Sequence, residues 1–181
     1  YVIAAGTMAF ELEKPEGFGF QAGQHTVVHL PELRYEDKKG ASRPFTIASA
    51  PKADTLLIVT RQTESGFKKT WKELPLESEI KITPANGELV LDQDKPAVFL
   101  TGGIGITPFR SMILDNYHRG METPLTLLYS NKTAETAAFH SFFTRMIKDF
   151  PALNYVPTLT ETNIHHNDWN GEKRILDEKF V

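Results

Sequence analysis

The sequence predicts a two-domain protein: an N-terminal antiparallel β-barrel followed by a C-terminal α/β domain built on a parallel sheet. Short strand-like runs separated by turns fill the first half, which is typical of antiparallel barrels. Strands then alternate with helices, which favours a parallel sheet. The polar stretch 92–96 separates the two patterns, so we predict domains at 1–94 and 95–181 of the 181 residues.

The predicted barrel strands alternate apolar and polar residues, are rich in β-branched residues or form short apolar runs. They are Thr7 to Glu13, Gln24 to Leu30, Arg43 to Ser49, Thr55 to Arg61, Glu79 to Thr83 and Glu88 to Leu91. Turn residues such as Asn86-Gly87 separate them. Only Phe67, Trp71 and Leu74 stand at helical spacing, which predicts one short helix inside the first half.

In the second half of the chain, apolar runs predict strands at 97–101, 125–130 and 154–160. A helix is expected from Pro108 to about residue 119, where Gly120 ends it. A second helix is expected over 134–150, because its aromatic and aliphatic residues recur at helical spacing. We interpret this stripe as core packing.

Composition excludes several classes of protein. A net charge of -3 with scattered basic residues gives no footprint for nucleic acid. The apolar runs are far shorter than a membrane span, and no secretory leader is recognisable, so we expect a cytoplasmic chain. The absence of cysteine excludes disulfides and iron-sulfur clusters within these residues. The adjacent His165 and His166 do not make a metal site, and we predict none.

A glycine-rich turn is the strongest functional signal. The strand at 97–101 leads into Gly102, Gly103 and Gly105, and Thr107-Pro108 suits an N-cap followed by the first helical residue. Such a turn lets backbone N–H groups and the helix dipole face an anion. The spacing excludes the Rossmann and P-loop patterns. We therefore expect a bound nucleotide, but not a kinase or an ATPase.

A second motif lies in the barrel half, at Arg43-Pro44-Phe45-Thr46. Arginine is a natural partner for phosphate, an aromatic face can cover a flat heterocycle, and a hydroxyl can bond a ring nitrogen. Taken alone, the same residues also suit a plain edge strand.

The two motifs, in this order and in these domains, resemble the ferredoxin-NADP reductase superfamily over nearly the whole chain. The resemblance implies that Arg43 and Pro44 lie at the flavin phosphate, Phe45 beside the isoalloxazine ring and Thr46 near its N5 atom. Further cofactor-binding residues are implied in both domains: Ile58 and Thr60 on the strand under the flavin diphosphate, Gly66 and Lys69 at the short helix, Gly102, Gly103, Gly105, Thr107 and Pro108 at the nicotinamide dinucleotide, and Ser130 and Lys132 at its adenosine ribose.

Two features depart from the family. Lys69 stands where many members have a serine that holds the flavin diphosphate, and two solvated lysines are an equally good reading of Lys68 and Lys69. The family also ends in a strand with Cys-Gly-Pro, whereas this sequence stops at Val181 and begins inside the expected first strand. We therefore expect a chain truncated at both ends, whose second domain lacks its last strand.

The resemblance implies a flavin-dependent NAD(P)H oxidoreductase that passes electrons to ferredoxin, another iron-sulfur protein or a haem protein. FAD is favoured over FMN because Ile47-Ala48-Ser49 resembles the FAD-binding members. Thr46 is the expected catalytic residue. Lys132 gives a slight preference for NADPH over NADH. Two alternatives stay open: an electron-transfer subunit that works only within a larger complex, and a flavin- or nucleotide-binding module without hydride transfer.

Overall fold

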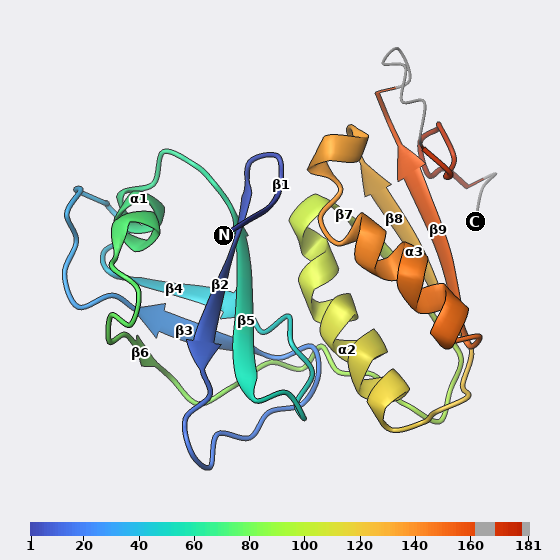
Figure 1. Ribbon diagram of the computed structural model, residues 1–181, viewed down its shortest axis with the longest axis horizontal. Coiled ribbons are helices and arrows are strands. Elements are labelled where there is room, and N and C mark those ends of the chain that lie inside the picture. Colours follow the sequence, from blue (N-terminus) through green and yellow to red (C-terminus); the bar gives the residue numbers. More distant parts are fainter. Residues whose placement is uncertain (162–168, 179–181) are drawn as a thin grey trace.

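The computed structural model describes residues 1–161 and 169–178. It has an antiparallel half and an α/β half, which lie side by side with the long helix α2 between them (Figure 1). This confirms the predicted fold class. The boundary near residue 94 stays a prediction.

The antiparallel half contains two three-stranded sheets. One has the order β1-β2-β5, formed by Val2–Ala4, Thr7–Glu13 and Thr55–Arg61; the other has the order β4-β3-β6, formed by Ser42–Thr46, His25–His29 and Lys81–Ile82. A bridge between Ile47 and Ile58 joins the sheets. Their apolar faces enclose a core that also takes Phe67 and Trp71 from helix α1 (Gly66–Glu73), so the core holds the start of this helix near β4.

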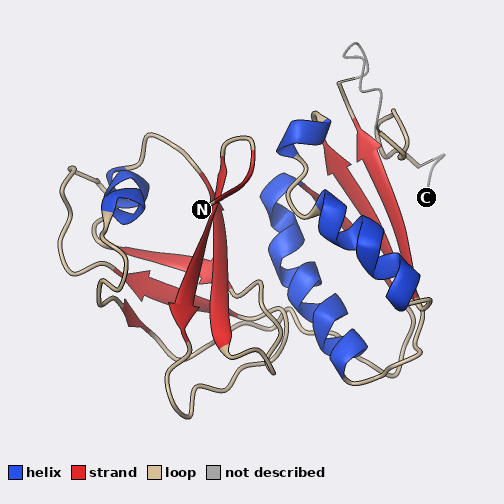
Figure 2. Ribbon diagram, in the orientation of Figure 1, coloured by secondary structure: helices blue, strands red, loops and turns tan. Residues whose placement is uncertain are grey.

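The α/β half is a parallel sheet of order β7-β8-β9, formed by Ala97–Gly102, Leu125–Asn131 and Leu153–Leu159. Helices α2 (Ile106–His118) and α3 (His140–Asp149) pack on the same face, since buried residues of both belong to one cluster with the strands (Figure 2). Alternation along β7 buries Phe99 and leaves Val98 and Leu100 64% and 58% exposed on the other face.

The two halves share a buried junction. Ser111 on α2 donates its hydroxyl hydrogen to the Ser49 carbonyl oxygen (2.6 Å), and the Arg110 guanidinium donates to the Ala48 carbonyl oxygen (2.5 Å). Burial lowers the pKa of Arg110 to about 10, so it stays protonated at neutral pH. The segment that directly follows β4 is therefore fixed against the first turns of α2.

Most predicted elements are present, with β2 and β5 matching the predicted bounds. The strand predicted at 88–91 is absent from the described structure: Leu89 and Val90 are 54% and 43% exposed and have no neighbouring strand. The helix predicted at 134–150 is divided, because a 3-10 turn at Ala134–Thr136 ends before Phe139, whose left-handed backbone (φ +63°) precedes α3. None of the helices within 1–161 and 169–178 has the length and hydrophobicity that a membrane span requires.

Candidate functional site

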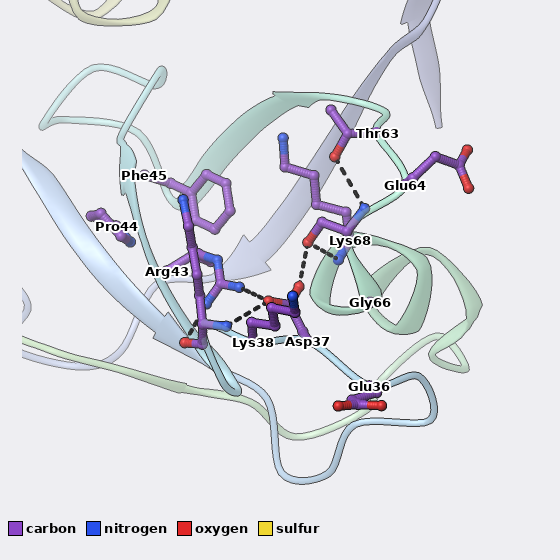
Figure 3. A pocket seen from close by; sticks show the side chains of 12 residues that line it. Glu36, Asp37, Lys38, Arg43, Pro44, Phe45, Thr63, Glu64, Gly66 and Lys68 are labelled. Atoms are coloured by element: carbon purple, nitrogen blue, oxygen red, sulfur yellow. Dashed lines mark hydrogen bonds and ion pairs between the residues drawn. The ribbon is translucent and has the colours of Figure 1, made fainter.

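A pocket of 670 Å³ opens between β4, the loop before it and the start of α1 (Figure 3). This volume lies within the range of roughly 300 to 1,000 Å³ that is usual for ligand sites. The pocket brings together four of the predicted site residues: Arg43, Pro44, Phe45 and Gly66. It also contains eight residues outside the predicted site: Glu36, Asp37, Lys38, Lys39, Thr63, Glu64, Ser65 and Lys68.

The start of α1 forms one wall of this pocket. Ser65 is the N-cap, and its side chain accepts from the Lys68 backbone N–H (3.5 Å). The Phe67 N–H donates to the Asp37 carboxylate (3.0 Å), and the Ser65 hydroxyl donates to the same oxygen (2.6 Å). The orphan donors of a helix N-terminus and its positive dipole end therefore bind an anion here, supplied by the chain itself.

Arg43 forms the opposite side of the anion site. Its guanidinium pairs with Asp37, and its other terminal nitrogen donates to the backbone carbonyl oxygens of residues 39, 40 and 42 at 2.6 to 2.9 Å. The side chains of Arg43 and Asp37 are only 15% and 7% exposed. Hydrogen bonds from the Phe67 N–H, Ser65 and the Lys39 N–H, together with the charge of Arg43, hold the pKa of Asp37 far below its usual value.

An aromatic wall completes the pocket. The Phe45 ring lies 5.9 Å from the Phe67 ring and 5.1 Å from the Trp71 ring, so it packs against two aromatic side chains of α1. The other face of such a ring offers an apolar surface to a flat ligand. Thr46, next along β4, does not line this pocket in the described structure, and lies two residues before Ala48 at the junction with α2.

A smaller pocket of 190 Å³ lies between β5 and α1 and is rich in basic side chains. It takes in the predicted residues Thr60 and Lys69, together with Arg61 and Lys68, and Lys68 lines both pockets. Lys69 is paired with Glu64 at 2.5 Å. Burial, followed by the charge of Arg43, lowers the pKa of Lys68. Ile58 is fully buried in the barrel core and lines neither of these two pockets.

The glycine-rich turn lies at the end of β7, where Gly102 is in register with Ser130 of β8. Lys132 follows directly after β8, so Ser130 and Lys132 are at the carboxyl edge of the parallel sheet, as predicted. Gly103 has a left-handed backbone (φ +53°), and a Cβ there would overlap the guanidinium of Arg61. Arg61 thus reaches from the end of β5 to the turn. Arg61 ends a predicted strand, but no motif in the sequence marks it as a site residue.

The predicted capping of α2 is wrong. The 3-10 turn Gly103–Gly105 runs directly into the helix, which begins at Ile106 with Gly105 as N-cap. Thr107 is therefore already inside the first turn and donates its hydroxyl hydrogen to the Ile104 carbonyl oxygen (3.2 Å). Pro108 is the third helical residue. Because N–H groups in the first turn have no intrahelical acceptor, its lack of an N–H costs no hydrogen bond there. A short helical turn before a helix has no clear signal in the sequence.

Within 1–161 and 169–178, no three His, Cys, Asp or Glu side chains cluster as metal ligands would. The adjacent His165 and His166 lie outside the described residues.

Comparisons with known proteins identify both halves. A family model described as an FAD-binding domain matches residues 1–107, and one described as an oxidoreductase NAD-binding domain matches residues 99–181. The phenol hydroxylase P5 protein of Acinetobacter pittii is 26% identical over 89% of this chain and 44% of that protein. The flavohemoprotein of Candida albicans is 31% identical over 77% of this chain and 34% of that protein. The chain therefore spans less than half the length of these relatives.

Solved structures show the same fold. The flavohem-like FAD/NAD-binding domain of nitric oxide dioxygenase from Vibrio cholerae matches with a TM-score of 0.80 and 15% identity, over 98% of this chain and 77% of that chain. A ferredoxin NADP+ reductase from Neisseria gonorrhoeae, with bound FAD and NADP, matches with a TM-score of 0.75 and 22% identity, over 93% of this chain and 68% of that chain. With both family models in place, the chain belongs to the ferredoxin-NADP reductase superfamily, as an FAD-binding domain followed by an NAD-binding domain.

Proposed function

We propose that this chain is the part of an NAD(P)H-dependent reductase in which electrons enter, and that it serves a separate electron acceptor. FAD, when bound, would take a hydride from the nicotinamide and release electrons singly. The observation that carries the proposal is the pocket of Arg43, Phe45 and the α1 N-terminus. It shares Lys68 with the smaller pocket, whose Arg61 reaches the glycine-rich turn.

The residues of the larger pocket fit FAD. An aspartate carboxylate already stands there as an anion bound by a guanidinium and a helix N-terminus, which are the donors that a diphosphate needs. We propose that Arg43 and the start of α1 hold the diphosphate and that Phe45 flanks the flavin ring. Thr46, at the end of β4 that faces α2, would orient the ring's reactive edge with its hydroxyl.

The dinucleotide would lie on the other side of the junction. The backbone of Gly102, Gly103 and Gly105 and the first turn of α2 offer N–H groups to a diphosphate. Arg61 adds a positive charge at the same turn. Lys132, at the carboxyl end of β8, is placed to meet the 2′-phosphate of NADPH, because ligands of such sheets bind at that edge.

The names of the relatives support a protein acceptor. They include the reductase component of a phenol 2-monooxygenase and of a terephthalate 1,2-dioxygenase. We infer that the acceptor of this chain is an iron-sulfur or haem centre on another domain or protein, in a cytoplasmic setting.

An anaerobic titration tests the proposal. The chain is loaded with FAD, freed of unbound flavin, and titrated with NADPH and separately with NADH while the visible flavin absorbance is recorded. We expect the absorbance to bleach with one equivalent of the preferred nucleotide. Retained FAD that neither nucleotide bleaches would contradict the proposed activity and favour a flavin-binding module.

A further inference from the structure

We propose that Asp37 is an internal counter-anion. Its carboxylate occupies the binding site of the flavin diphosphate, and the diphosphate displaces it when FAD binds. The inference rests on the proposed function, because it assumes that FAD uses this pocket. It assigns a residue of the loop before β4 the role of setting how tightly the flavin is held.

The carboxylate of Asp37 binds the guanidinium and the helix N-terminus that line the pocket. One oxygen pairs with the Arg43 guanidinium and accepts from the Lys39 N–H (2.9 Å). The other accepts from the Ser65 hydroxyl and the Phe67 N–H at the start of α1. Figure 3 shows the Arg43 and Asp37 side chains pointing toward one another and joined by their ion pair. These are the donors that a phosphate group would also use.

Asp37 competes with a phosphate for the Arg43 guanidinium. One terminal nitrogen of Arg43 is already engaged by three backbone carbonyl oxygens, so a fork-like contact with phosphate would use the nitrogen that also pairs with Asp37. A carboxylate and a diphosphate at one buried site also repel each other. Diphosphate binding is therefore strongest when Asp37 has turned away.

The loop itself is anchored, so the exchange is a rotation of one side chain. The Arg34 N–H donates to the Thr70 hydroxyl oxygen (3.1 Å), and the Tyr35 hydroxyl donates to the Glu73 carboxylate (2.9 Å). A Cβ at Gly66 would overlap the backbone carbonyls of residues 35 and 36, which shows how closely the loop backbone lies on α1. The pocket wall next to Asp37 carries Lys38 and Lys68, whose charges suit a carboxylate that has left Arg43.

The test is an equilibrium titration of flavin-free protein with FAD, followed by flavin fluorescence, for the wild type and Asp37→Asn. Asparagine keeps the size and the acceptor oxygen but removes the charge. We expect FAD to bind at least about tenfold more tightly, because Arg43 no longer pairs with a carboxylate and one charge-assisted contact becomes available to the diphosphate. Riboflavin, which lacks phosphate, is the second probe. Its affinity should change by less than about twofold, because Asp37 competes only with a phosphate group.

Glu36→Gln is the matched control, because Glu36 lines the same pocket and carries the same charge one residue away from the ion pair. Its FAD affinity should stay close to that of the wild type. The melting temperature of flavin-free Asp37→Asn should fall, because Arg43 and the α1 N-terminus lose their anion. If this variant does not fold, Asp37→Ser gives the same test with a short neutral acceptor.

An FAD affinity of Asp37→Asn equal to or weaker than that of the wild type would overturn the inference and make Asp37 a residue that positions Arg43. An equal gain for FAD and riboflavin would overturn it too, as would an equal gain in Glu36→Gln. These outcomes leave the proposed function intact, because wild-type FAD binding is measured in the same series. Failure of every form to bind FAD would refute the proposed function itself.

Discussion

Removal of the Arg43 guanidinium is the most informative single change at the pocket. In Arg43→Ala the diphosphate loses a charged donor. The carboxylate of Asp37, still bound by Ser65 and the Phe67 N–H, remains at the same position. The Arg43 side chain is only 15% exposed, so solvent and salt screen its charge little. A charge-assisted hydrogen bond contributes roughly 1.5 to 3 kcal/mol, which corresponds to about a 10- to 150-fold loss of FAD affinity.

The assay is equilibrium binding of FAD by fluorescence, with circular dichroism to confirm folding. Arg34→Ala is the matched control, because Arg34 carries the same charge nearby. Its side chain is 53% exposed and forms a long ion pair with Glu73, at 3.8 Å. Its FAD affinity should stay within about twofold of the wild type, as expected for an exposed pair. A purified Arg43→Ala protein that keeps FAD with wild-type affinity would refute the assignment of this pocket.

Three further substitutions test separate parts of the site. Thr46→Ala should slow flavin reduction by NAD(P)H in stopped flow more than it weakens FAD binding, and an unchanged reduction rate would remove Thr46 from the reacting edge. Arg61→Ala should weaken binding of NADPH and NADH by about tenfold, because one charged contact at the glycine-rich turn is lost; calorimetry showing equal affinity would contradict this. Lys132→Glu should lower the affinity for NADPH more than that for NADH, and equal losses would exclude contact with a 2′-phosphate.

The regular parts of the fold could be predicted because their signal is local. Period-two alternation marks β2 and a short apolar run marks β5, both to the residue, and the alternation of strand and helix marks the parallel sheet. The ends of elements depend on neighbours that the sequence does not show. The 3-10 turn ahead of α2 and the left-handed Phe139 ahead of α3 are two such cases.

The candidate site was predictable only in part. The residues Arg43 to Phe45 and the glycine-rich turn carry recognisable motifs, and the structure places each at a separate part of the site. Asp37 has no such signal: it stands in a polar loop, and only the folded chain brings it between Arg43 and the start of α1. Arg61 was missed for the same reason, since its neighbour Gly103 is far away in the sequence.

A crystal structure of the chain with FAD is the most direct test of the central claim, that one pocket holds the flavin between Arg43, Phe45 and the start of α1. We expect the diphosphate within hydrogen-bond distance of the Arg43 guanidinium and the Phe67 N–H, with the ring against Phe45 and Asp37 turned away. FAD bound elsewhere, with the Arg43–Asp37 pair unchanged, would contradict the claim.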